Sequence, residues 1–233
     1  MRVLVTRPAR AAEATAAALR QRGHVPLLLP LTVPLYPDLV WPEMNPGALI
    51  ATSAEAFRAI GRGAIGHAFK SRPVYCVGPA TAAAAADLGF QDCRVGPGEA
   101  AGLVELIRAD QRTSEAPLLY LAGVPRLPAL EEGLKAAGLP LQVMDVYRME
   151  PVAVGDLSAQ LAALKPEAVL FYSREAVRLF FSALSGPLAT PLDLLCLSPA
   201  IAAAVPPGAG RVHVAAQPEE VALLDRLDAL AAS

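Results

Sequence analysis

The sequence predicts an α/β protein made of two similar domains, each with a parallel β-sheet covered by helices. Short, continuous apolar runs alternate with helical runs along the chain, which is typical of parallel strands buried on both faces. Several segments recur in order at a constant spacing. An apolar share of 54% against a charged share of 18% is ample for packed cores and disfavours disorder.

The chain begins with a strand, a helix and a second strand. Residues 2–6 form an apolar strand, and the helical periodicity that follows continues to about Arg22, where Gly23 ends it. Residues 24–30 are the next strand. Residues 31–38 contain several prolines and show no helical pattern, so we expect an extended linker there.

The middle of the chain alternates strands with helices. Ser53 is placed to cap the helix after the first of these strands, and Gly78-Pro79 starts the next helix, because proline is preorganised for a first helical turn. An extended run at 141–151, which contains Tyr147, leads out of this region. The expected strand and helix pairs are 48–52 with 54–60, 74–77 with 80–88, 92–95 with 101–109, and 118–122 with 127–137.

The last third repeats the pattern of the middle. After a helix at 156–164, we expect a strand at 168–172 and a helix at 174–184. The remaining elements are a strand at 192–197, a short helix from Pro199, a strand at 212–215 and a helix at 219–230.

An internal repeat decides the domain layout. Three phrases return 120 residues later, and they pair Ser53 with Ser173, Gly78 with Ser198, and Glu99 with Glu219. A fourth match has a different spacing, because the phrase from Val3 resembles the one from Leu118. The segment that lies at the start of the outer copy therefore lies at the end of the middle copy. This order indicates a duplication in which the middle copy is inserted in the outer one.

The repeat predicts two flavodoxin-like or Rossmann-like domains. Residues 1–30 and 152–233 are expected to form an outer domain, and residues 38–148 an inserted one. The linkers, 31–37 and 149–151, would run in opposite directions as a two-stranded hinge beside a cleft between the sheets.

Composition excludes several classes of function. A net charge of −2 provides no basic field for nucleic acid or an acidic membrane surface, and no apolar run is long enough for a membrane span. The chain opens with a strand rather than a secretory signal. The cysteines lack CxxC spacing and the histidines lack metal-pair spacing, so we expect no disulfide and no metal in a reduced, cytoplasmic protein.

The candidate binding residues lie at turns between strands and helices. No dinucleotide fingerprint, phosphate loop or nucleophile elbow is present, but the turns would present backbone N–H groups to an anion. With nearby arginines, this suits a large ligand that carries several carboxylates. Tyr147 would either overhang the cleft or pack in the hinge. The other candidate residues are Arg7, Ser53, Thr81, Arg126, Arg148, Ser173 and Arg174, and the serines are open to a purely structural capping role.

Five segments together resemble the uroporphyrinogen-III synthase family, over nearly the full length of the chain. They are VLVTRP (3–8), IATSAEAF (50–57), VYCVGPATAAAAADLG (74–89), LEEGLKAAG (130–138) with VYR (146–148), and AVLFYSREAVRLF (168–180). The resemblance implies two α/β domains, one inserted in the other, joined by a two-stranded linker. It also implies the conversion of linear hydroxymethylbilane to uroporphyrinogen III, with inversion of ring D and loss of water, in tetrapyrrole biosynthesis. No metal or organic cofactor is implied.

The resemblance also assigns roles to residues. Tyr147 matches the family's linker tyrosine, which is suspected of assisting the departure of hydroxide. The turn residues that match ligand-facing positions are Ser53, Gly78, Thr81, Ser173 and Ser198. Ile201 stands where the family usually has a hydroxyl residue, which puts a side-chain contact at that turn in doubt but not a backbone contact.

Two other classes of function stay open from the sequence. A non-catalytic two-domain module that binds a polyanionic small molecule would have the same cleft. An enzyme of sugar phosphates or nucleotides is less favoured, because phosphate loops are missing. A monomer is expected, since no stripe for association is evident.

Overall fold

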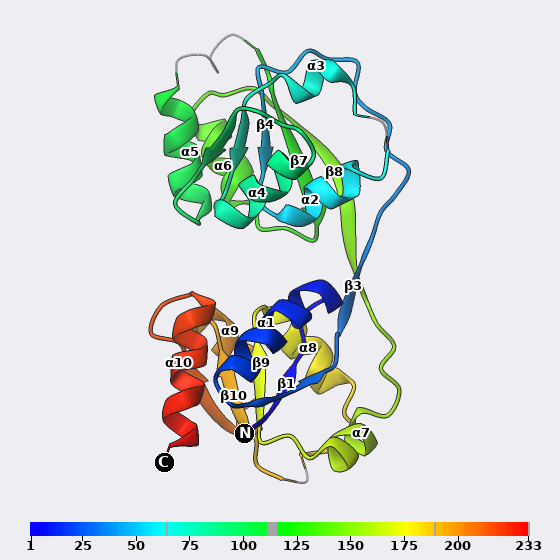
Figure 1. Ribbon diagram of the computed structural model, residues 1–233, viewed down its shortest axis with the longest axis vertical. Helices are drawn as coiled ribbons and strands as arrows, with labels where there is room; N and C mark the ends of the chain where they lie inside the picture. Colours follow the sequence, from blue (N-terminus) through cyan, green and yellow to red (C-terminus); the bar gives the residue numbers. More distant parts are fainter. Residues whose placement is uncertain (64, 111–115, 189, 233) are drawn as a thin grey trace. The chain divides into compact units, whose positions relative to one another are not determined.

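A computed structural model describes residues 1–63, 65–110, 116–188 and 190–232 (Figure 1). The chain divides into two compact units, and the first is made of two separate segments. Unit 1 comprises Met1–Val33 and Glu150–Ser233, and unit 2 comprises Pro34–Met149. Each unit has its own sheet with helices packed against it, which confirms the predicted α/β class with two mainly parallel sheets.

Unit 1 contains a five-stranded sheet in the order β11-β10-β9-β1-β2, and its neighbouring strands are all parallel. The strands are β1 (Arg2–Val5), β2 (Val25–Leu28), β9 (Ala168–Phe171), β10 (Asp193–Cys196) and β11 (Arg211–Val214). The helices are α1 (Ala9–Gln21), α7 (Leu157–Leu164), α8 (Arg174–Ser182), α9 (Pro199–Ala202) and α10 (Glu220–Ala231).

The second sheet, which belongs mainly to unit 2, has the order β3-β8-β7-β4-β5-β6. Its strands are β3 (Thr32–Leu35), β4 (Ala48–Ala51), β5 (Val74–Cys76), β6 (Cys93–Val95), β7 (Leu118–Val124) and β8 (Leu141–Pro151). The helices are α2 (Ala54–Ile60), α3 (His67–Lys70), α4 (Pro79–Asp87), α5 (Ala100–Ala109) and α6 (Ala129–Ala136).

The linker agrees with the expected two-stranded arrangement, and one helix of unit 2 was not predicted. The linker segment 31–37 contains β3, which is hydrogen-bonded to β8, and β8 pairs with β7 as far as Arg148. Helix α3 was not predicted, because four residues carry no readable period.

Strands that correspond in the sequence repeat hold the same place in each sheet. The order β2-β1-β9-β10-β11 in unit 1 matches β8-β7-β4-β5-β6 in unit 2. In each sheet the direction of winding reverses once, between β1 and β9 and between β7 and β4. In open α/β sheets, ligands bind at such a reversal, beyond the carboxyl ends of the strands.

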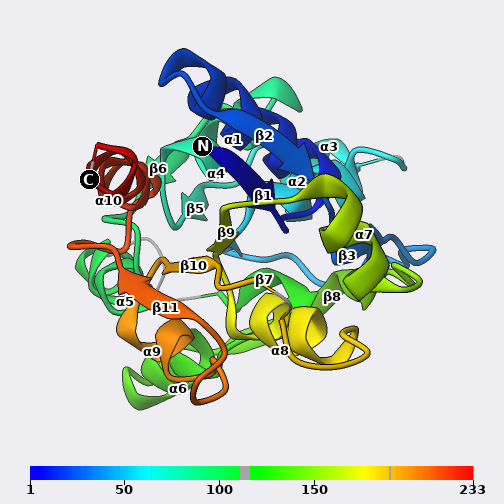
Figure 2. The same cartoon turned by 90° about the horizontal axis from the view of Figure 1, so that it is seen from below.

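Each sheet is buried on both faces, as the continuous apolar strands require. In unit 1, α8 and α9 cover one face, where Phe171 meets Phe180 with 5.4 Å between the ring centroids. Helices α1 and α10 cover the other face, mainly through Leu19 and Leu223 (Figure 2). In unit 2 the corresponding pairs are α2 with α4 and α5 with α6.

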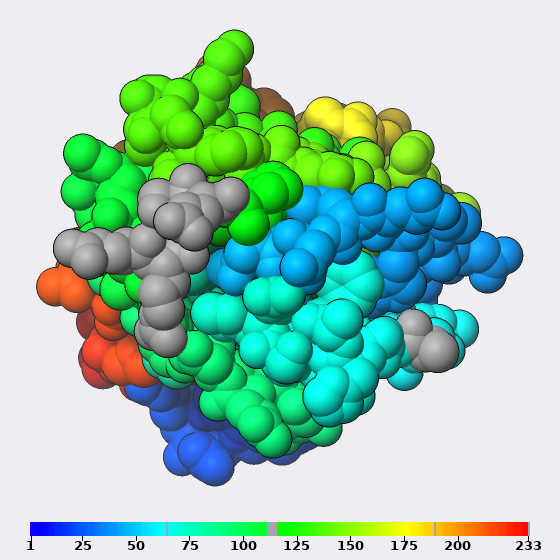
Figure 3. All heavy atoms as spheres, turned by 90° about the horizontal axis from the view of Figure 1, so that it is seen from above, coloured from blue at the N-terminus to red at the C-terminus, as the bar shows by residue number. Residues whose placement is uncertain are grey.

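The segment between β3 and β4 adds a further layer to unit 2. Trp41 stacks on Phe69 of α3, with 4.4 Å between the ring centroids. Tyr36, Leu39 and Met44 pack with them against the same core. Figure 3 shows this segment, in blue, lying beside the region of α2 and α3, in cyan.

Asp193 at the start of β10 makes the stability of unit 1 sensitive to acid. Its buried carboxylate accepts two hydrogen bonds of 2.8 Å from the Arg211 guanidinium and one of 2.8 Å from His213. The bond from Arg211 contributes most to holding the pKa of Asp193 below its ordinary value, and burial opposes it. A carboxyl with a lowered pKa in the folded state stabilises the fold above its unfolded-state pKa of about 4, and this contribution is lost as the pH falls through the folded-state pKa.

We expect Asp193→Asn to be less stable than the wild type at neutral pH, and the difference to shrink as the pH falls below about 4. The measurement is the free energy of unfolding by urea between pH 3 and pH 7. A difference that stays constant over this range would contradict the role of the ionised carboxylate.

Candidate active site

The predicted turn residues lie at the carboxyl edges of the two sheets. Parallel strands end at the same edge, so the turns after neighbouring strands lie side by side. In unit 2, Arg126, Ser53 and Gly78 follow the neighbouring strands β7, β4 and β5. In unit 1, Arg7, Ser173 and Ser198 follow β1, β9 and β10. Each group therefore surrounds the reversal point of its own sheet.

Two of these serines cap helices. The Ser53 hydroxyl accepts a hydrogen bond of 3.1 Å from the backbone N–H of Glu55 at the start of α2. The Ser173 hydroxyl accepts one of 3.1 Å from the N–H of Ala176 in α8. Gly78 and Ser198 are the N-cap residues of α4 and α9, and each precedes a proline in the first turn. All four turns therefore direct a helix N-terminus, with its partial positive charge, toward the carboxyl edge.

Tyr147 of β8 lies beside the first of these turns. Its ring is half-buried against the core of unit 2, and it pairs with Gly123 of β7. Burial raises the pKa of Tyr147 above its ordinary value, and the neighbouring Ser53 hydroxyl partly opposes this effect. The phenol therefore keeps its proton at neutral pH and is a weak acid.

A second tyrosine, Tyr120, contacts the residue before Ser53. The hydroxyl groups of Tyr120 and Thr52 are 2.8 Å apart, and Thr52 directly precedes Ser53. Tyr120 is almost fully buried, and burial raises the pKa of its phenol. This contact joins β7 to the end of β4 across the reversal point of the sheet.

The charge of Arg126 is balanced inside unit 2. Its guanidinium donates to the carboxylate of Glu131 at 2.5 Å and to that of Asp145 at 2.7 Å. It also lies 3.4 Å from the carbonyl oxygen of Gly123. The bond to Glu131 is the main cause of the raised pKa of Arg126.

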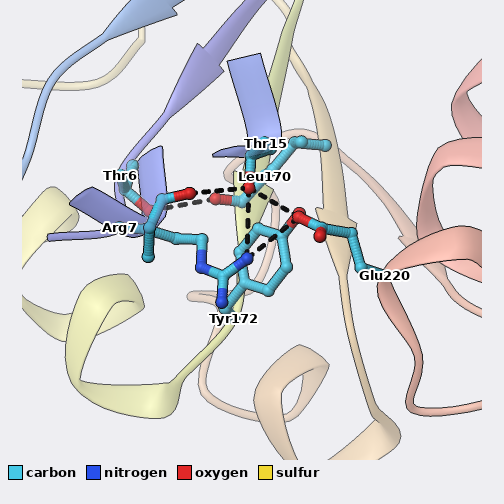
Figure 4. A network of polar contacts seen from close by, with 7 residues as sticks. Thr6, Arg7, Thr15, Leu170, Tyr172 and Glu220 are labelled. Atoms are coloured by element: carbon cyan, nitrogen blue, oxygen red, sulfur yellow. Dashed lines mark hydrogen bonds and ion pairs between the residues drawn. The ribbon is translucent and has the colours of Figure 1, made fainter. Parts of the chain in front are cut away.

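Arg7 is held in a comparable network in unit 1 (Figure 4). Its guanidinium donates to Glu220 at 2.9 Å and to Thr15 at 3.1 Å, and it lies 4.2 Å above the ring centroid of Tyr172. The Thr15 and Tyr172 hydroxyls donate to the same Glu220 oxygen at 2.5 Å and 2.7 Å. Since Tyr172 precedes Ser173, the network fixes the turn at which α8 begins.

Sequence reasoning missed the carboxylates that balance both arginines. Glu131 lies in the helix after Arg126 and Asp145 lies on β8, so finding them required the pairing of β7 with β8. Glu220 is separated from Arg7 by 213 residues. A substrate-binding role for these arginines stays a prediction, and it has to account for their internal partners.

Position 81 and its repeat counterpart, position 201, face inward. Thr81 is 5% exposed and Ile201 is 7% exposed, and Ile201 packs in the apolar core of unit 1. An isoleucine at position 201 therefore suits its surroundings. A contact between substrate and the Thr81 hydroxyl stays a prediction.

The three cysteines are free thiols. Cys76 and Cys196 are buried, and burial raises the pKa of Cys76 to about 12 and that of Cys196 to about 11. They pack as small apolar side chains in β5 and β10, and their thiols stay protonated.

Comparison with known proteins decides the family. A family model described as uroporphyrinogen-III synthase HemD matches residues 13–225, which is most of the chain. The chain belongs to the uroporphyrinogen-III synthase family. This confirms the resemblance found in the sequence motifs, and it places the chain in tetrapyrrole biosynthesis. Membership in this family supports the synthase function over that of a non-catalytic binding module.

Solved structures share the fold. The uroporphyrinogen-III synthetase from Helicobacter pylori is 18% identical, over 99% of this chain and 100% of that chain, with a TM-score of 0.69. A mutant uroporphyrinogen III synthase from the thermophilic bacterium Thermus thermophilus is 20% identical over 100% of both chains, with a TM-score of 0.59. In the part of the chain that the structure describes, no helix combines the length and apolar character that crossing a bilayer requires.

Proposed function

We propose that this protein is a hydro-lyase that closes hydroxymethylbilane to uroporphyrinogen III, with Tyr147 as the proton donor. In the reaction, the carbon–oxygen bond of the hydroxymethyl group breaks and water leaves. For ring D to be inverted, the freed methylene carbon bonds to the ring D carbon that already carries the chain, and the old carbon–carbon bond at that position breaks. The methylene carbon released by this break bonds to the unsubstituted carbon of ring D, which loses its proton. The reaction is redox-neutral, so its balance needs no electron acceptor.

The observation that carries the proposal is the place of the Tyr147 phenol. It is a protonated weak acid at the carboxyl edge of the sheet, next to Ser53 and the first turn of α2. A weak acid at this edge is suited to give a proton to the departing hydroxide. The positive end of α2 points toward the same place and would attract a carboxylate of the substrate.

The turns are proposed to hold the substrate mainly through backbone groups. The substrate carries eight carboxylates according to the family resemblance, and each unit directs two helix N-termini to its carboxyl edge. Arg7 and Arg126 already have carboxylate partners. We therefore assign Arg7 to fixing the turn at Ser173 and Arg126 to joining β7 to β8 beside Tyr147. The backbone N–H groups of the turns are then the main contacts to substrate.

A matched pair of variants at Ser173 tests this assignment. Aspartate and asparagine are both good N-cap residues, so Ser173→Asp and Ser173→Asn keep the cap and differ in charge. We expect Ser173→Asp to raise KM about 5- to 30-fold relative to Ser173→Asn, because one added like charge near a carboxylate costs about 1–2 kcal/mol. Steady-state kinetics at low ionic strength gives the comparison.

The stability of the same pair provides the control. A carboxylate near a helix N-terminus stabilises the helix by about 0.3–1 kcal/mol, so Ser173→Asp should be at least as stable as Ser173→Asn. Equal KM values for two folded variants would show that no substrate carboxylate binds at this turn.

The reaction itself is tested by product analysis. Hydroxymethylbilane is generated enzymatically and mixed with the protein, and the porphyrin isomer is identified after oxidation. We expect type III, because unassisted closure gives the uninverted type I isomer. Type I alone, at the rate seen without the protein, would rule out the proposed activity and favour a binding module.

We further propose that the two units are the predicted domains, 1–30 with 152–233 and 38–148, and that the protein works as a monomer in the cytoplasm. The two compact units of the chain agree with these boundaries to within a few residues, which supports the proposal. Gel filtration at assay concentration tests the monomer.

A further inference from the structure

Gly123 of β7 lies opposite Tyr147 of β8. The two residues are paired in the sheet, directly after an irregularity in the pairing between Ala122 and Gly123. The Tyr147 ring leans across β7 at this point and occupies the space that a side chain at position 123 would need. An aromatic ring packed over a glycine on a neighbouring strand is a known way to fix a strand pair.

The space above Gly123 is too small for even a methyl group. A Cβ atom at position 123 would lie 2.7 Å from Cε2 of Tyr147, and closer still to Cζ and the hydroxyl oxygen of the same ring. Carbon atoms that are not bonded to each other do not approach so closely, so the ring would have to move. The backbone of Gly123 is not in the left-handed region, so the requirement is for space.

The surroundings decide where a displaced ring would go. On its inner side, Tyr147 packs against the apolar core of unit 2. The carbonyl of Gly123 and the Asp145 carboxylate both contact Arg126, which ties β7 to β8 next to the ring. Because the core and this tie resist movement, a side chain at position 123 would push the phenol outward, away from Ser53.

We propose that Gly123 is a positioning residue for the reaction, because its missing side chain seats the Tyr147 phenol over β7 and beside Ser53. The inference rests on the proposed role of Tyr147 as proton donor. Gly123 has no group that acts on the substrate, and its effect passes entirely through the place of the phenol.

The test is Gly123→Ala, with Gly186→Ala as the matched control. Gly186 also has an ordinary backbone conformation, and among the described residues nothing lies within 4 Å of a Cβ atom there. We expect Gly123→Ala to lower kcat roughly 10- to 100-fold, close to the effect of Tyr147→Phe, with little change in KM. Gly186→Ala should keep the wild-type rate.

A spectroscopic measurement distinguishes a displaced Tyr147 phenol from a general loss of structure. With ¹³Cζ-labelled tyrosine, the Tyr147 resonance is assigned from its absence in Tyr147→Phe, and it is followed through a pH titration. Burial is the main cause of the raised pKa of Tyr147, so an outward phenol in Gly123→Ala should titrate at lower pH than in the wild type. An unchanged titration together with an unchanged rate would overturn the proposal.

A double variant shows whether Gly123→Ala acts through the Tyr147 ring or damages the fold independently of it. In a Tyr147→Ala background there is no ring to displace, so adding Gly123→Ala should change neither folding nor rate. A further loss there, equal to that in the wild type, would show that Gly123 acts independently of Tyr147 and would overturn the proposal. Tyr147→Phe with a wild-type rate would instead overturn the proton-donor role, and it is measured separately.

Discussion

Tyr147→Phe is expected to lower kcat by about 100-fold or less, while the product stays uroporphyrinogen III. Phenylalanine keeps the ring that packs over Gly123 and removes the proton donor. General acid assistance is worth roughly 10²–10⁴-fold, and the electron-rich pyrrole expels this leaving group readily, so the low end applies. The initial rate and the isomer ratio are measured on protein whose fold is confirmed by circular dichroism.

Tyr75→Phe is the control for losing a buried tyrosine hydroxyl in the same unit. The Tyr75 hydroxyl donates to Asp110 at 2.6 Å, so its loss should lower stability and leave the rate of the folded protein unchanged. A wild-type rate for Tyr147→Phe would make Tyr147 a packing residue. A normal rate with type I product would show that it steers the conformation of the substrate.

Phe171→Ala is expected to destabilise unit 1 by about 3–5 kcal/mol. The side chain is fully buried and contacts two further aromatic rings, Phe180 at 5.4 Å and Phe181 at 6.4 Å between centroids. Since β1 pairs with β9, the amides of Arg2–Val5 should lose protection from hydrogen exchange together with those of Ala168–Phe171.

The same experiment tests the discontinuous domain. The amides of Ala48–Ala51 belong to the other sheet, so they should keep their protection in Phe171→Ala. If Arg2–Val5 instead kept its protection while Ala48–Ala51 lost it, the assignment of the first 30 residues to the outer domain would be wrong.

The sequence predicted the order of elements well because each sheet is buried on both faces. Continuous apolar runs such as 168–172 then stand out from amphipathic helices such as 101–109. The helix that Ser53 caps runs over the predicted residues, since a cap is a local signal. Helix α3 was not predicted, because a four-residue helix has no period. Strand β8 spans the same residues as the extended run predicted at 141–151.

The site could be predicted only at the level of its turns. Strand ends and caps are visible in the sequence, so Ser53, Gly78 and Ser173 could be placed at the carboxyl edges. The partners of Arg7 and the inward direction of Thr81 depend on packing between distant elements. The position of the Tyr147 phenol over Gly123 depends on the register between β7 and β8. This register includes an irregularity in the pairing that no sequence pattern predicts.

The central claim is that the turns determine which isomer forms and that Tyr147 contributes to the rate. The most direct test is the fraction of type III product at increasing protein concentration, for the wild type and for Tyr147→Phe. We predict that both proteins approach complete type III product, and that the variant needs more protein to outrun unassisted closure. A plateau at mixed isomers for Tyr147→Phe would contradict this division of roles, and type I at every concentration of the wild type would contradict the activity.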